Sequence, residues 1–247
     1  MSNELIFAIN VLFYLSTVLV LYKIFGKNGL FVYSVFSTLL ASVAVCKCFS
    51  LFGFTANAGI VQYAVTFLIT DILSEKYGKK EAGKAVWYSI SAMLLWVVGT
   101  QLALLFIPNS MTKNMSDVLN SIFGLTPRIF IASMVANVCS QNFDVFMYHF
   151  IWKKTGNNKQ FLWLRNNGST TISQAIDTVV FIFLAFWGMY PAGTVLNLLF
   201  TTYIFKALVA ILDTPFIYLA RKISPIFEKS SAEVAAEVNT NEILESA

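Results

Sequence analysis

Apolar residues follow the chain in long runs that short polar connections interrupt. Each run is close to the length that a bilayer-crossing helix requires, roughly 20 residues. The pattern predicts seven helices, namely Leu5–Phe25, Leu30–Phe52, Ile60–Tyr77, Ala82–Ile107, Arg128–Trp152, Thr171–Tyr190 and Val195–Ala220. The third run is the weakest, because polar residues enter its second half. We include it because the basic connections on either side of it would otherwise fall on opposite sides of a membrane.

The composition agrees with a chain that lies mostly in a membrane. Hydrophobic residues make up 57% of the 247 residues and charged residues 12%, and the mean hydropathy is +0.69. Soluble domains contain about 25% charged residues. We therefore predict an all-α fold, a polytopic bundle of about seven transmembrane helices. One membrane domain would cover residues 1–229, and residues 230–247 would form an acidic cytoplasmic tail.

Basic residues are distributed unevenly over the connections. Lysines and arginines gather after the first, third, fifth and seventh predicted helices, whereas residues 55–59 and 191–194 carry no charge. Because cytoplasmic connections carry an excess of Lys and Arg, the alternation predicts an outside N-terminus and a cytoplasmic C-terminus in the cytoplasmic membrane. The connection at residues 108–127 should hold a short amphipathic helix capped by Ser116, either as a lid or at the membrane interface.

Ionisable residues recur inside the apolar runs. They are Lys47, Asp71, Asp144, Asp177, Lys206 and Asp213. A charged side chain at the centre of a bilayer costs roughly 3 kcal/mol, so such residues usually face a polar interior. Pairing between helices would account for single members of the set. The acids nevertheless outnumber the lysines, which fits a ligand rich in hydrogen-bond donors or a role in proton coupling.

Polar residues at helical spacing form stripes along four of the predicted helices. In the fifth, Asn137, Gln141, Asp144 and Tyr148 fall within about 60° of arc, and similar stripes mark the third, sixth and seventh. Before the sixth, the segment Trp163–Ser169 should be a cytoplasmic loop in which Asn167 or Ser169 caps the helix. The candidate substrate-binding residues are Asp71, Glu75, Asn137, Gln141, Asp144, Asn167, Ser173, Gln174, Asp177, Lys206 and Asp213.

The sequence gives little support to catalysis or metal binding. Cys46 and Cys48 are close together, but no second Cys or His cluster joins them. No serine lies in a nucleophile-elbow motif, and no phosphate-binding loop for ATP is present. We expect no enzyme activity, no cofactor and no direct nucleic-acid partner, because the net charge of +4 arises from basic residues at helix ends. An ion channel and a binding subunit that depends on a separate ATPase remain alternatives.

Several polar segments, in this order and spacing, resemble the queuosine precursor transporter family, a branch of the vitamin-uptake-transporter-like proteins. They are Thr70–Lys80, Ser140–Asp144, Trp163–Thr170, Ser173–Thr178, and Lys206 with Asp213–Pro215. The resemblance implies uptake of a 7-deazaguanine base (preQ0, preQ1 or queuine) for tRNA modification. It also implies a fold similar to the substrate-binding subunits of energy-coupling-factor importers, with Leu5–Phe25 as an added helix.

The candidate residues suit such a base chemically. A guanine-like edge presents an N–H and an amino group side by side, which one carboxylate can accept together, and its carbonyl requires a donor. Asp144 and Asp177 are the leading candidates for the carboxylate, with Gln141, Gln174 and Lys206 as further edge partners. Another small vitamin-like solute is the alternative substrate. The energy source, any energising partner or homo-oligomer, and the choice among the three bases are left open.

Overall fold

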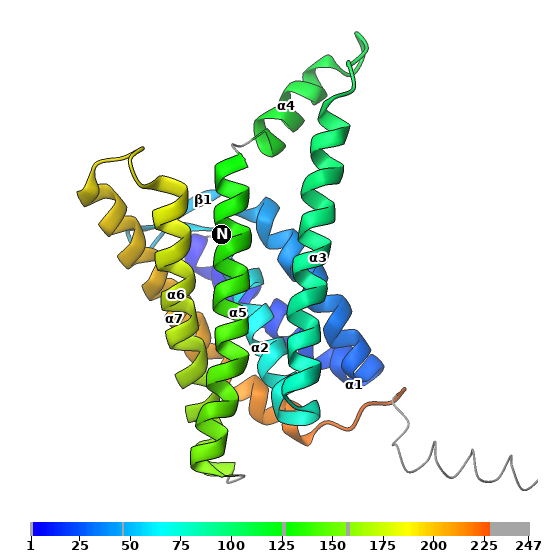
Figure 1. Cartoon of the computed structure of the whole chain (residues 1–247), viewed down its shortest axis with the longest axis vertical. Coiled ribbons are helices and arrows are strands. Elements are labelled where there is room, and N and C mark those ends of the chain that lie inside the picture. The colour runs from blue at the N-terminus through cyan, green and yellow to red at the C-terminus, as the bar shows by residue number, and fades with distance from the viewer. Residues whose placement is uncertain (1, 46, 125–126, 157–158, 228–247) are drawn as a thin grey trace, which may run out of the picture.

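The computed structural model describes residues 2–45, 47–124, 127–156 and 159–227, so the acidic tail lies outside the described residues. The described chain is a helical bundle with one β-hairpin, which confirms the all-α prediction. Its elements are α1 (Asn3–Ala44), β1 (Cys48–Leu51), β2 (Phe54–Asn57), α2 (Ile60–Tyr77), α3 (Lys79–Leu104), α4 (Lys113–Phe123), α5 (Pro127–Thr155), η1 (Lys159–Phe161), α6 (Leu162–Phe186) and α7 (Ala192–Lys222). Figure 1 places α4 and the α6–α7 turn at one end of the bundle and the α5–α6 turn at the other.

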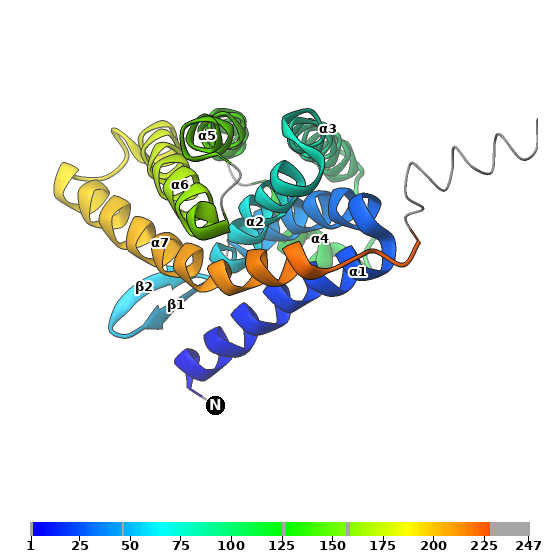
Figure 2. The same cartoon turned by 90° about the horizontal axis from the view of Figure 1, so that it is seen from below.

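Helix α2 is the central helix of the bundle. Figure 2 shows α1, α3, α6 and α7 around it. All of its residues from Ile60 to Ser74 are buried, except for the half-buried Tyr63. A helix enclosed by protein need not be apolar on every face, because neighbouring helices supply partners for its polar side chains. This position explains why the same residues gave the weakest hydropathy signal.

Helix α1 contains two of the predicted helices, which meet at Gly26. The backbone of Gly26 has φ 59° and ψ −140°, a left-handed conformation that glycine adopts without steric cost. The second arm ends at Ala44 rather than at Phe52, and an antiparallel hairpin follows it. The prediction that Lys47 lies inside a helix is therefore wrong, since Lys47 is exposed between α1 and β1. The apolar residues after it form a strand with alternating exposure, not another helical turn.

The close approach of the two arms leaves no room for a side chain at Gly29. A Cβ atom there would lie 2.5 Å from the Leu21 carbonyl oxygen, whereas nothing lies within 4 Å of a Cβ at Gly99 in α3. We expect Gly29→Ala to lower the melting temperature in detergent, because overpacking costs about 1–3 kcal/mol. Gly99→Ala should instead raise it slightly, because alanine favours a helix by about 1 kcal/mol. Equal shifts for the two variants would contradict this packing.

Two connections differ in detail from the prediction. The amphipathic helix at residues 108–127 is confirmed as α4, but its N-cap is Thr112 and not Ser116. Helix α6 begins at Leu162, nine residues before the predicted start at Thr171, so Asn167 and Ser169 lie inside the helix and do not cap it. Polar residues in this first part of α6 are buried and bonded to neighbouring helices, which explains how a polar segment is helical.

The outer surface of the bundle is strongly apolar. Among the described residues, α1, α3, α6 and α7 are long and apolar enough to cross a membrane. Large side chains point outward from them, including Leu12 (61% exposed), Leu95 (72%) and Ile211 (63%). An exposed apolar surface of this extent is typical of contact with lipid. Helices α2 and α5 are not among these long apolar helices, in keeping with the polar faces that they turn inward.

Candidate substrate-binding site

A cavity opens within the half of the bundle that carries the hairpin. The cavity volume is about 100 Å³. The cavity is lined by helices α1, α2, α3, α5, α6 and α7 and by the end of β2. The lining residues are Thr38, Ala41, Ser42, Val45, Asn57, Gly59, Ile60, Tyr63, Met93, Ser133, Ala136, Asn137, Asp177, Phe181, Thr202 and Lys206.

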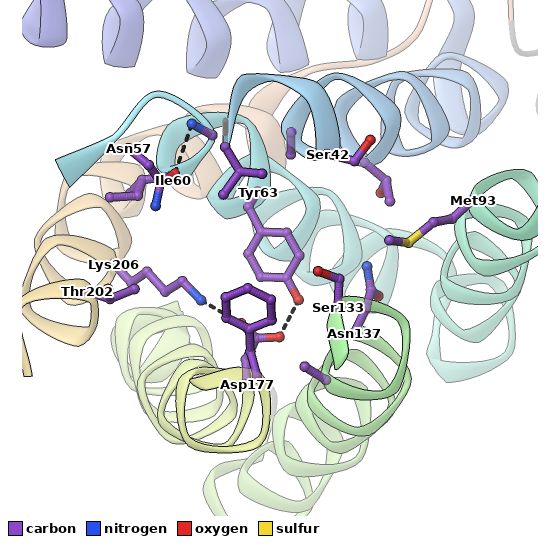
Figure 3. A pocket seen from close by; sticks show the side chains of 16 residues that line it. Ser42, Asn57, Ile60, Tyr63, Met93, Ser133, Asn137, Asp177, Thr202 and Lys206 are labelled. Atoms are coloured by element: carbon purple, nitrogen blue, oxygen red, sulfur yellow. Dashed lines mark hydrogen bonds and ion pairs between the residues drawn. The ribbon is translucent and has the colours of Figure 1, made fainter. Parts of the chain in front are cut away.

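Asp177 of α6 is the centre of the polar wall of this cavity (Figure 3). Its Oδ1 accepts hydrogen bonds from the Tyr63 hydroxyl at 2.6 Å and from the Ser140 hydroxyl at 3.1 Å. Its Oδ2 accepts from the Lys206 Nζ at 2.5 Å. The ammonium also lies 4.9 Å from the centre of the Tyr63 ring, a cation–π contact. Helices α2, α5, α6 and α7 thus meet at one carboxylate.

The cavity is electrically balanced. Asp177 and Lys206 are its only charged lining residues among those described, and they form an ion pair whose side chains are 6% and 9% exposed. Apolar groups of Ile60, Met93 and Phe181 complete the lining. A carboxylate has about four acceptor positions, of which three are filled here. The site therefore suits a solute with an uncharged hydrogen-bonding edge, whose donors compete for Asp177 and whose acceptor binds Lys206.

Three further carboxyl groups lie deeper in the bundle, among α2, α5, α6 and α7. Asp71 and Asp144 are 0% exposed and Asp213 is 1% exposed. Each accepts a hydrogen bond from at least one neutral side chain. The bonds are Thr170 Oγ1 to Asp71 at 3.2 Å, Thr70 Oγ1 to Asp144 at 3.4 Å, and Asn166 Nδ2 to Asp213 at 2.8 Å. No described cation pairs with any of the three.

Glu75 belongs to a separate ion-pair cluster near the end of α2. Arg165 binds both of its carboxylate oxygens, at 3.1 and 3.0 Å, and Arg221 lies 3.5 Å away. The Tyr148 hydroxyl donates to the same carboxylate at 2.8 Å. Arg165 is fully buried and stacks over the Trp152 ring. This arrangement ties four helices together at the end of the bundle remote from the cavity.

The structure distributes the predicted site residues over these three places. The cavity brings together Asn137, Asp177 and Lys206. Gln141 is buried just below and donates to Thr66 at 2.5 Å. Ser173 hydrogen-bonds the Ser169 carbonyl oxygen in the same interface. Outside the cavity lining are the buried Gln174, the three carboxyl groups of Asp71, Asp144 and Asp213, Glu75 in its ion-pair cluster, and Asn167, which donates to Thr214.

Sequence reasoning missed several residues that line the cavity. Tyr63 is the most important, because its hydroxyl holds Asp177. It lies three residues before Thr66 and seven before Thr70, so a polar stripe along α2 indicated it. Ser133 extends the stripe of α5 by one turn above Asn137 in the same way. Met93 and Phe181 carry no comparable signal, since apolar residues in a membrane helix face lipid as often as a pocket.

Comparison with known proteins agrees with this arrangement. A family model described as "Putative vitamin uptake transporter" matches residues 57–220, which include Tyr63, Asp177 and Lys206. The "Probable queuosine precursor transporter" of Bacillus subtilis (strain 168) is 43% identical over 214 residues, 87% of this chain and 93% of the relative. No solved structure matches the chain. It is a multi-pass membrane protein, and it belongs to the vitamin uptake transporter family.

Proposed function

We propose that the chain imports queuosine precursors, the 7-deazaguanine bases preQ0, preQ1 and queuine, across the cytoplasmic membrane. The name of the Bacillus subtilis relative supports this class of solute. The observation that carries the proposal is the ion pair of Asp177 and Lys206 on the wall of an otherwise uncharged cavity. The N-terminus lies outside and the C-terminus in the cytoplasm, as the distribution of basic residues indicates.

The ion pair matches the hydrogen-bonding edge of a guanine-like base. The ring N–H and the exocyclic amino group donate to the Asp177 carboxylate, and the neighbouring carbonyl oxygen accepts from Lys206. Because the two side chains touch, they reach adjacent positions on one edge. Tyr63 and Ser140 hold the carboxylate in place, and the Phe181 ring lines the cavity as a stacking surface. Asp144 does not line the cavity, so we assign the carboxylate role to Asp177 alone.

Uptake of a labelled base tests this function. In a host that lacks other importers of these bases, cells expressing the protein should accumulate labelled preQ1, and excess unlabelled preQ0 should compete. Adenine should compete poorly, because its 6-amino group donates where Lys206 requires an acceptor. Uptake no greater than in cells with empty vector, with the protein present in the membrane, would refute the proposal. Equal competition by adenine would refute the role of Lys206.

A further inference from the structure

The carboxyl groups of Asp71, Asp144 and Asp213 form a cluster that substrate binding at Asp177 does not use. They come from α2, α5 and α7. Thr70, the residue before Asp71, donates to Asp144, and Thr170, which donates to Asp71, lies one turn of α6 from Asn166, which donates to Asp213. Each has one oxygen without a hydrogen-bond donor among the described residues. Three carboxylates buried in one region of the bundle would repel one another if all were ionised.

The charged groups on the surrounding helices do not neutralise this cluster. Arg165 of α6 is bound by Glu75 of α2. On α7, the Lys206 ammonium is bound by Asp177. Tyr148 of α5 donates its hydroxyl to Glu75. The Arg165 guanidinium and the Lys206 ammonium therefore already have carboxylate partners, and the cluster keeps a surplus of acid.

A proton is the ligand that this geometry suits. Thr70 directly precedes Asp71 and donates to Asp144, so the two carboxyl groups lie on facing parts of α2 and α5, and a proton on one of them removes the repulsion between two carboxylates. Among the described residues, no three acidic, histidine or cysteine side chains are placed to hold a metal ion. A bound proton removes charge and supplies the missing donor at once, which a buried carboxyl in a membrane requires.

Gln174 independently indicates a polar ligand in the same interface. Its side chain is 0% exposed, and neither its amide nitrogen nor its amide oxygen has a partner among the described residues. It lies one turn of α6 from Thr170, which donates to Asp71, and one turn from Asp177 on the other side. A buried amide left without partners is costly, so its position between the two sites favours a polar path between them.

We propose that Asp71, Asp144 and Asp213 form a proton-binding site whose proton crosses the membrane together with the solute. The proton occupies the carboxyl cluster while the solute occupies the cavity at Asp177, and Gln174 connects the two. Import then draws on the proton gradient and needs no ATPase. The coupling to a 7-deazaguanine rests on the proposed function, whereas the proton site itself does not.

Infrared spectroscopy tests the proton site without any solute. Exposed carboxyl groups are ionised at neutral pH, because their reference pKa values are about 4. The full-length protein in lipid should nevertheless show the carbonyl stretch of a protonated carboxyl group at neutral pH, with a shift in D2O. Asp71→Asn and Asp144→Asn should each remove or displace this band, and Glu81→Gln at the start of α3 should leave it unchanged. If the wild-type protein shows no such band, the proposal is wrong. This test does not depend on whether the variants fold.

Transport in proteoliposomes tests the coupling. With the interior made alkaline, labelled preQ1 should accumulate about tenfold per pH unit for one proton per solute, and a protonophore should abolish this. Asp71→Asn should let the base equilibrate without concentrating it. If the wild-type protein brings the base to the same internal concentration with and without a pH gradient, the proposed coupling is wrong. If no 7-deazaguanine enters under any gradient, the proposed substrate is wrong, and the infrared result still decides the proton site.

Discussion

Asp177→Asn should abolish accumulation of a 7-deazaguanine and weaken its binding to the purified protein by about a hundredfold. The substitution replaces one carboxylate acceptor with an amide N–H that faces the N–H groups of the base. A hydrogen bond to a charged group contributes about 1.5–3 kcal/mol, and 1.4 kcal/mol is a factor of ten. Equilibrium binding of the labelled base in detergent measures the effect directly.

The matched control for this prediction is the same substitution on the exposed helix α4. Asp117 lies on the surface of α4 and away from the cavity, so Asp117→Asn should leave both binding and uptake unchanged. Tyr63→Phe should have an intermediate effect, since it keeps the ring beside Lys206 and removes one donor to Asp177. If Asp177→Asn and Asp117→Asn bind the base with equal affinity, Asp177 is not part of the binding site.

Glu75→Gln should destabilise the protein strongly while leaving the cavity intact. Glu75 is 4% exposed and accepts two hydrogen bonds from Arg165, which is fully buried. Removing one partner of a buried ion pair leaves an uncompensated charge and costs about 3–5 kcal/mol. We expect a large fall in melting temperature in detergent and a lower level in the membrane. Any protein that does fold should bind the base with unchanged affinity.

Glu81→Gln provides the comparison, because Glu81 pairs with lysines near the surface. Its partners Lys84 and Lys27 have side chains that are 46% and 40% exposed. Exposed ion pairs contribute little to stability, so this variant should melt at the wild-type temperature. A melting temperature of Glu75→Gln equal to that of Glu81→Gln would show that the buried cluster does not hold the helices together. Weaker binding by folded Glu75→Gln would place Glu75 in the substrate site.

The helices and their inward faces could be predicted from the sequence. The stripe of Asn137, Gln141, Asp144 and Tyr148 is buried as the helical period requires, and two of its members bond to α2. Periodicity assigns such faces because a polar side chain in a membrane protein must find a partner inside the bundle. The distribution of basic connections, rather than periodicity, retained α2 despite its weak hydropathy.

Other features depend on tertiary partners that no local pattern reveals. The start of α6 resembled a loop because it is polar, yet Arg165, Asn166 and Thr170 find their partners on α2 and α7. The apolar residues after Lys47 resembled the continuation of a helix, although they pair as a hairpin. The candidate list could not be divided into a cavity, an acid cluster and an ion-pair cluster, since that division depends on which helices are neighbours.

The most direct measurement is a structure of the protein with a bound 7-deazaguanine. We expect the base in the cavity between α2, α5, α6 and α7, with its amino and ring N–H groups on Asp177 and its carbonyl oxygen on Lys206. A base bound at the Glu75 cluster, or one whose guanine-like edge faces away from Asp177 and Lys206, would contradict this assignment.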